Sequence, residues 1–286
     1  MLSWAKVIES CDDIPGAYQG AFQALPGNNR VFPYVILAPA FGKSRYQSAE
    51  KLICDIDDVF YVLESVDDQI VAKGYPRETI RDVEMGRFFL HSWITISGPT
   101  VDGVLASSTL EFNTATHRLF MPFLNKIRPA ASGPDAMGLK AEQGKFDYLA
   151  SMDIKFMNYA RNSLMRGEKV IDILWQPAIR KRVLTLLGWP FYKTLSLAHL
   201  TILTDKEVIL IRDAEYSRGN KGLGYGNVWQ YIPLRSIRSA SLTEETDNVL
   251  NLCFCLSPDT HLERIFAASN RREMEHFRNE IERLIG

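Results

Sequence analysis

Two stretches of the chain follow one pattern: Pro76-Arg77-Glu78-Thr79-Ile80-Arg81-Asp82-Val83 and Pro233-Leu234-Arg235-Ser236-Ile237-Arg238-Ser239-Ala240. Each begins with proline and two variable residues, continues with a small hydroxyl residue, Ile and Arg, and ends with a small polar and a small aliphatic residue. An eight-residue match can arise by chance. The pattern therefore needs support from other matches in the same order along the chain.

Further matches do keep that order. The stretches are preceded by Glu50-Lys51-Leu52-Ile53 and Glu168-Lys169-Val170-Ile171. They are followed by Phe112, Arg118, Phe123, Asn125 and Ile127 in the first copy and by Phe266, Arg272, Phe277, Asn279 and Ile281 in the second. This self-similarity predicts one structural unit used twice, and the second copy carries about forty extra residues between its first two landmarks.

Composition limits the class of protein. The chain has 286 residues, of which 46% are hydrophobic and 23% charged, as expected for a globular protein of two domains. Its formal net charge of -1 lacks the basic footprint typical of nucleic-acid binding, so no nucleic-acid partner is predicted. No apolar run approaches the roughly 20 residues that cross a bilayer, and the first residues do not resemble an export signal. We predict a cytoplasmic protein, with peripheral contact to a membrane left open.

The order of turn, strand and helix signals predicts the organisation. Residues 1–30 form an arm laid on a first domain of residues 31–130, a linker of residues 131–166 follows, and a second domain covers residues 167–286. Each domain contains about six or seven antiparallel strands and then one helix that plugs the open end of a bent sheet. The linker contains a helix at roughly 145–166. Pro122 makes the first terminal helix start late or kink, and Asn270 with Glu273 predicts a capping box on the second.

Parts of the second copy resemble the bacterial pleckstrin-homology-like (PH-like) domains. The residues that carry the resemblance are Gly167-Glu168-Lys169-Val170-Ile171, Leu203-Thr204-Asp205-Lys206-Glu207-Val208-Ile209-Leu210 and Tyr231-Ile232-Pro233-Leu234-Arg235-Ser236-Ile237. Residues 49–128 are linked to the family mainly through the internal repeat. The resemblance implies a bent antiparallel β-sandwich or partly open barrel capped by a C-terminal helix. It also implies a binding or assembly module without catalytic activity.

The resemblance implies a ligand site as well. Eukaryotic relatives of the fold hold inositol phosphates with a lysine, a spacer and a basic-x-Arg group, and Lys169 followed by Arg180-Lys181-Arg182 fits that pattern. Lys193 and the aromatic residues Trp189, Phe191 and Tyr192 follow, and such a mixture suits a membrane interface. The alternative is a solvated basic turn with Trp189 and Phe191 packed under the sheet. The matching region of the first copy has Asp55, Asp57 and Asp58, which would repel phosphate.

Other motifs predict little chemistry. The glycines Gly219, Gly222, Gly224 and Gly226 lack the Lys and Ser/Thr of a phosphate-binding loop and indicate a hairpin loop. The five histidines show no metal-ligand spacing, and Cys253 and Cys255 share one strand face, which favours reduced thiols over a disulfide. We predict no metal, no cofactor and no catalytic residue.

Two functions remain open at this point. The first is a non-enzymatic module that contacts a protein partner, its own copies or an anionic lipid head group through the insertion 175–196. The alternative is a hydrolase or transferase with a site in a cleft between the domains, near residues 131–166.

Overall fold

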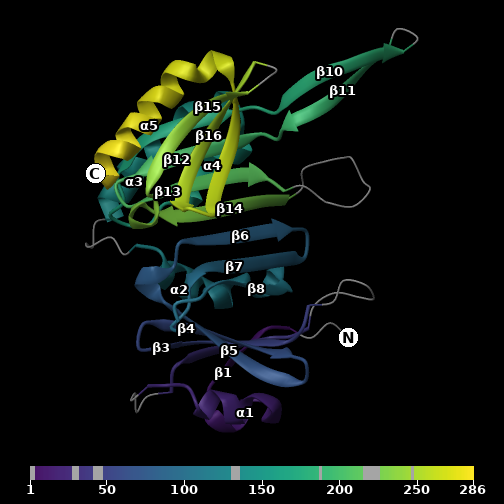
Figure 1. Ribbon diagram of the computed structural model, residues 1–286, viewed down its shortest axis with the longest axis vertical. Coiled ribbons are helices and arrows are strands. Elements are labelled where there is room, and N and C mark those ends of the chain that lie inside the picture. Colours follow the sequence, from purple (N-terminus) through teal and green to yellow (C-terminus); the bar gives the residue numbers. More distant parts are fainter. Residues whose placement is uncertain are drawn as a thin grey trace. The chain divides into compact units, whose positions relative to one another are not determined.

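The computed structural model describes residues 4–27, 32–40, 48–129, 136–186, 189–214, 226–245 and 248–286. The chain divides into two compact units, Met1–Arg128 and Pro129–Gly286 (Figure 1). Both units are mainly β with helices, which confirms the predicted class, and the sheets of the described residues do not close into a barrel.

The first unit begins with a five-stranded antiparallel sheet in the order β1-β2-β3-β4-β5. Its strands are β1 (Lys6–Ile8), β2 (Tyr34–Ala38), β3 (Lys51–Ile56), β4 (Val59–Val66) and β5 (Gln69–Pro76). Pairs of aspartates form two of its two-residue turns: Asp57 and Asp58 have φ of 49° and 63°, and Asp67 and Asp68 have φ of 49° and 61°. Positive φ at both central residues is the hairpin geometry that matches the twist of the flanking strands.

A three-stranded meander and one helix complete the first unit. The meander contains β6 (Asp82–Phe88), β7 (His91–Pro99) and β8 (Leu105–Asn113), and buried residues alternate along β7 as expected for a sheet with one covered face. The helix α2 (His117–Ile127) inserts Phe120 and Phe123 between the two sheets, where Phe120 stacks on Phe112 of β8 at 3.9 Å. Because α2 begins before Pro122 and contains it, the prediction of a late start was wrong.

The described part of the N-terminal arm lies on the first unit. After β1 come the 3-10 helix η1 (Cys11–Asp13) and the short helix α1 (Gly16–Gln23), which lies on the outer face of the five-stranded sheet (Figure 1). Tyr18 and Phe22 are the buried residues of α1, and the Tyr18 hydroxyl donates a hydrogen bond of 2.7 Å to the Glu50 carbonyl.

The second unit has the same two kinds of sheet. Its first sheet has the order β9-β12-β13-β14, made from β9 (Val170–Gln176), β12 (His199–Thr204), β13 (Glu207–Asp213) and β14 (Gly226–Pro233). Its second sheet is the meander of β15 (Ser239–Glu245), β16 (Val249–Ser257) and β17 (Thr260–Ala267). The C-terminal helix α5 (Arg271–Ile285) contacts β9 of one sheet and β15 of the other, and buries Met274, Phe277 and Ile281 between them. Asn270 makes no side-chain cap on α5, so the predicted capping box is wrong.

The predicted linker helix is also corrected. In place of one helix over 145–166, the chain forms α3 (Ala136–Gly144), the 3-10 helix η4 (Asp147–Ser151) and α4 (Ile154–Ser163). A new helix starts at α4 because the Asp153 side chain accepts hydrogen bonds from the backbone N–H groups of Lys155 and Phe156. Since α4 packs on β12 and β13, this segment belongs to the second unit and is not a free linker.

The central landmarks of the repeat occupy matching places in the two units. Pro76 ends β5 and Pro233 ends β14, and a 3-10 turn follows each, η2 (Arg77–Thr79) and η5 (Leu234–Ser236). The isoleucines that come next, Ile80 and Ile237, are both buried. The later landmarks are core residues of the meanders and terminal helices: Phe112 and Phe266, Phe123 and Phe277, Ile127 and Ile281.

The Glu-Lys pairs, Glu50-Lys51 and Glu168-Lys169, do not occupy corresponding places in the two units. Counted back from the proline-ended strands, β3 corresponds to β12 and β2 to β9. Lys51 therefore opens the strand that corresponds to β12, whereas Lys169 lies just before β9. The connection between these corresponding strands covers residues 39–50 in the first unit and residues 177–198 in the second. The second connection is therefore longer by about ten residues, and the predicted insertion of about forty residues was wrong.

Candidate functional site

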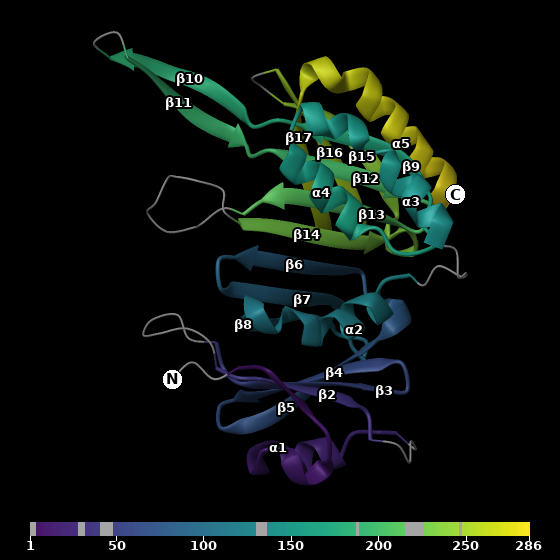
Figure 2. The same ribbon diagram turned by 180° about the vertical axis from the view of Figure 1, so that it is seen from behind.

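The insertion of the second unit is a β-hairpin. β10 (Ile179–Leu186) and β11 (Trp189–Ser196) pair with each other in a two-stranded sheet of their own. Figures 1 and 2 show this hairpin extending away from the other strands of the second unit. Its register places Lys181 opposite Lys193 and Arg182 opposite Tyr192, and Leu186 opposite Trp189 at the far end.

The base of the hairpin is held by two buried side chains. Gln176, the last residue of β9, accepts hydrogen bonds from the Ala267 N–H at 2.8 Å and from the Asn270 side-chain amide at 3.3 Å. His199, the first residue of β12, lies with its Nδ1 2.9 Å from the Leu197 carbonyl oxygen and 3.3 Å from Ser196 Oγ. These contacts connect both ends of the hairpin to the body of the unit.

Four of the predicted site residues come together on this hairpin. The side chains of Arg180, Lys181, Arg182 and Lys193 are all exposed. No acidic residue occurs between Pro177 and Ala198, although the whole chain has a net charge of -1. The hairpin is therefore a local concentration of positive charge on a chain that is otherwise acidic.

The cations are divided between the two faces of the hairpin. Successive side chains of a strand point to opposite faces, and directly paired residues share a face. Arg180, Arg182 and Tyr192 therefore share one face, whereas Lys181 and Lys193 share the other. Like charges directly opposite each other destabilise a strand pair, so the Lys181 and Lys193 pairing favours an anion nearby.

Of the three aromatic residues predicted to contact a membrane or partner, two are exposed on the hairpin and one has no described side chain. Phe191 and Tyr192 are 51% and 60% exposed, which excludes packing of Phe191 under the sheet. Trp189 is placed by its backbone register only, because its side chain lies outside the described residues, as do residues 187–188. Val183, which was not among the predicted contact residues, is 59% exposed on β10. Its place next to Arg182 in an apolar run was the available signal.

Lys169 does not join this group. Its N–H donates to Asp205 Oδ1 at 2.8 Å, and its carbonyl accepts from the Asp205 N–H at 2.9 Å, so it lies at the turn between β12 and β13. The seven residues of β9, at about 3.3 Å each, place it roughly 23 Å from the base of the hairpin. The inositol-phosphate pattern of Lys169 with Arg180 and Arg182 is thus wrong as a description of one site.

The acidic stretch of the first unit is not the counterpart of the basic hairpin, contrary to the prediction. Asp57 and Asp58 form the turn between β3 and β4, and the Asp55 carboxylate is paired with Lys126 of α2 at 2.5 Å. The topological counterpart of the hairpin is the connection 39–50, whose residues 41–47, with Lys43 and Arg45 among them, lie outside the described residues.

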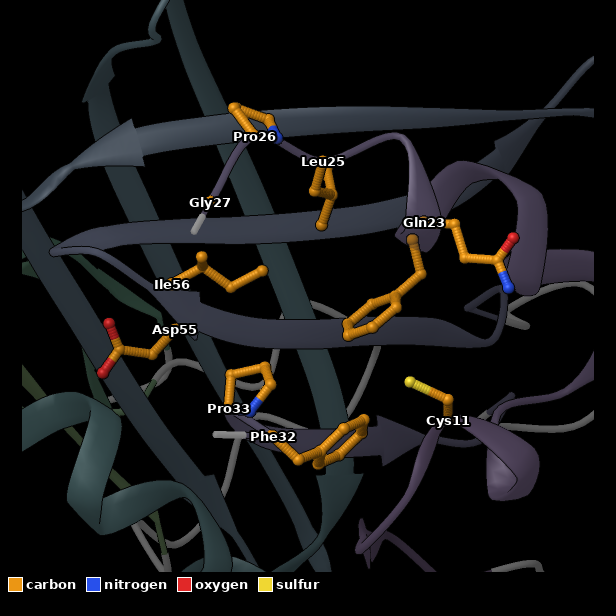
Figure 3. Close-up of a pocket in the computed structure, with 10 residues that line it drawn as sticks. Cys11, Gln23, Leu25, Pro26, Gly27, Phe32, Pro33, Asp55 and Ile56 are labelled. Atoms are coloured by element: carbon orange, nitrogen blue, oxygen red, sulfur yellow. The ribbon is translucent and has the colours of Figure 1, made fainter. Parts of the chain in front are cut away.

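A pocket of about 530 Å³ on the first unit is the other candidate site. Figure 3 shows Leu25, Ile56 and the Cys11 thiol pointing into it, whereas the Gln23 amide and the Asp55 carboxylate point away. Of the described residues that line it, none presents an ionisable pair toward the interior. The pocket therefore offers an apolar surface and not the facing acid and base of a hydrolase.

The remaining motifs add no chemistry. Gly219, Gly222 and Gly224 lie outside the described residues, in the connection between β13 and β14. Within the described ranges, no group of His, Cys, Asp and Glu side chains could hold a metal ion. Nor do these ranges contain a helix with the length and apolarity needed to cross a bilayer. Burial raises the pKa of the Cys54 thiol to about 12, so it is a core residue and not a nucleophile.

Comparison with known proteins adds no assignment: no protein-family model matches the chain, and no curated protein matches it.

Proposed function

We propose that the chain is a non-enzymatic module of two PH-like domains and that the β10–β11 hairpin attaches it to membrane surfaces rich in anionic lipid. One observation supports this above all: the hairpin carries four exposed cations and exposed aromatic side chains, contains no acidic residue, and extends from the body of its unit. The order of two antiparallel sheets followed by a helix in each unit supports the PH-like part of the proposal.

The exposed side chains of the hairpin set the free energy of its attraction to an anionic membrane. A basic side chain near an anionic leaflet contributes about 1 kcal/mol, so four contribute about 4 kcal/mol, which corresponds to roughly millimolar binding. Full burial of an apolar side chain contributes about 1.5–3 kcal/mol. Because Phe191 and Val183 are already about half buried, together they add roughly 2 kcal/mol. The sum, about 6 kcal/mol, corresponds to a dissociation constant of roughly 10–100 μM.

Sedimentation with vesicles tests the proposal. Wild type should pellet with vesicles that contain phosphatidylserine and stay in solution with pure phosphatidylcholine. The triple variant Arg180→Glu, Lys181→Glu, Arg182→Glu should stay in solution with both, because it replaces attraction by repulsion.

A matched control changes the net charge by the same amount elsewhere. Lys6, Lys140 and Arg272 are exposed and lie outside the hairpin, so their joint replacement by Glu should leave most of the binding intact. Equal pelleting of wild type and the hairpin variant would contradict the membrane proposal. Light scattering on the same samples would then show whether the hairpin contributes to self-association instead.

A further inference from the structure

Two apolar side chains project from the two-residue turn between β6 and β7 in the first unit, which we call the apolar turn. Its residues, Phe89 and Leu90, are 65% and 66% exposed. Phe89 has φ of 53°, a left-handed conformation that a bulky residue rarely adopts and that glycine usually supplies in such turns. The hairpin itself would fold more readily with a small or polar turn. Its own folding therefore does not explain the two apolar side chains.

Thr114 holds the apolar turn in place. Its Oγ1 donates a hydrogen bond of 2.9 Å to the Phe89 carbonyl, and its N–H donates one of 2.9 Å to the Leu90 carbonyl. Thr114 Oγ1 in turn lies 2.8 Å from Ser92 Oγ. Both carbonyls of the apolar turn are thus paired within the protein. This lowers the cost of moving the turn out of water, because an unpaired carbonyl is costly in an apolar medium.

Basic side chains lie close to the apolar turn. Arg87 precedes it on β6, and Arg118 lies in the first turn of α2, next to His117. Burial lowers the pKa of His117, the positive charges of Arg87 and Arg118 add to this shift, and a backbone hydrogen bond opposes it. Both guanidinium groups therefore lie near His117. The carboxylate of Glu111 on β8 is hydrogen-bonded to His91, with 3.1 Å between Oε1 and Nε2.

The turn at the opposite end of β7 has a different charge. Val104 and Leu105, in and after the connection between β7 and β8, are 63% and 49% exposed, so this turn is apolar too. It contains Asp102 and no basic residue. The two segments that meet at the apolar turn, residues 85–92 and 112–122, contain no Asp or Glu. Of these two turns, only the apolar turn between β6 and β7 therefore has the charge that an anionic surface attracts.

We propose that the apolar turn is a second membrane contact, in which Phe89 and Leu90 enter the head-group layer of an anionic leaflet while Arg87 and Arg118 contact lipid phosphates. An aromatic side chain beside basic ones suits this interface. Because only two side chains project, the contact stays within the head-group layer, which is roughly 5–8 Å thick. The inference rests on the proposed function for the kind of partner, an anionic membrane, and uses none of the hairpin residues.

Vesicle binding and thermal stability of the full chain test this together. The variant Phe89→Gly, Leu90→Ser should bind phosphatidylserine-containing vesicles roughly 10- to 100-fold more weakly than wild type. Its melting temperature should equal or exceed that of wild type, because glycine adopts positive φ without strain. Weaker binding by a variant that is at least as stable cannot be a result of misfolding.

The other turn of the meander provides a matched control. The variant Val104→Ser, Leu105→Ser removes similar exposed apolar surface and should bind vesicles as wild type does. Arg118→Gln should weaken binding about five-fold, the effect of one basic side chain. Equal vesicle binding by the two turn variants would overturn the inference. So would a Phe89 and Leu90 variant that binds vesicles as wild type does and loses only self-association in light scattering, because the turn would then contact a second copy.

The outcomes also separate this inference from the proposed function. If the Arg180, Lys181 and Arg182 variant loses vesicle binding and the Phe89 and Leu90 variant keeps it, the hairpin is the contact and the second contact is refuted. If the hairpin variant keeps binding and the apolar-turn variant loses it, the proposed role of the hairpin is refuted and the apolar turn stands. Failure of wild type to bind any anionic vesicle would contradict both.

Discussion

Acidification should weaken the second unit through His199 at the base of the hairpin. This side chain is 2% exposed, and its Nε2 has no hydrogen-bond partner among the described residues. The pKa of His199 is lowered to about 4, mainly because the ring is buried; the hydrogen bond to the Leu197 carbonyl opposes this shift, and the positive charge of Arg264 adds to it. His199 is therefore neutral in the folded protein at neutral pH.

The direction in which stability changes with pH follows from the pKa of His199 in the unfolded and the folded state. In the unfolded chain the histidine has its ordinary pKa of 6.5, whereas the folded value is about 4. Between these values the unfolded state binds a proton that the folded state does not, so stability falls as the pH drops from about 6.5 toward 4. Each pKa unit corresponds to about 1.4 kcal/mol, and the full loss is therefore about 3 kcal/mol. Asp172 and Asp213 oppose it, because burial raises their pKa and lets the folded state take up protons first.

A comparison of variants isolates the histidine from these carboxylates. Urea unfolding of wild type and His199→Gln at several values of pH between 7 and 4 should show that wild type loses about 3 kcal/mol more than the variant over this range. His261→Gln, at an exposed position, should follow wild type. The reasoning is refuted if wild type and His199→Gln lose stability in parallel, or if NMR titration shows that His199 protonates near pH 6.5.

Two further pairs of substitutions test the packing of the units. A Cβ added at Gly98 would lie 2.8 Å from the Thr79 carbonyl oxygen and 3.0 Å from the Ile80 Cα, so Gly98→Ala should destabilise the first unit by about 1–3 kcal/mol. Gly20 lies in α1 with open space around it, so Gly20→Ala should stabilise the unit by up to about 1 kcal/mol. Thermal melts in which both variants shift the melting temperature in the same direction would contradict this. Ile80→Ala and Ile237→Ala should each cost about 2–5 kcal/mol, and hydrogen exchange should show the loss in the unit that carries the change; a loss spread evenly over both units would argue against two separate cores.

The features that sequence predicted correctly depend on local chemistry. A proline ends a strand because it has no N–H to donate, and the isoleucine that follows a short turn has to be buried, so Pro76 with Ile80 and Pro233 with Ile237 mark the same place in both units. The amphipathic pattern around Phe123 and Phe277 likewise predicts the terminal helices, because an apolar stripe needs a sheet to cover.

Features that depend on strand order were not predictable in this way. Glu50-Lys51 and Glu168-Lys169 look alike because many strands begin with a charged residue and continue with aliphatic ones, yet they precede different strands of the two sheets. The break between η4 and α4 was missed because the cap by Asp153 competes with an apolar periodicity that runs across it.

By itself, the sequence determined the β class, the landmarks that the two units share from Pro76 and Pro233 onward, the helix that ends each unit and the location of a basic and aromatic segment. Each of these is set by residue type and spacing along the chain. Only the tertiary structure decided that this segment is a hairpin with cations on both faces and that Lys169 lies at the far end of β9. The reason is geometric: the distance between two side chains depends on the direction and pairing of the strands that carry them, and spacing along the chain does not specify either.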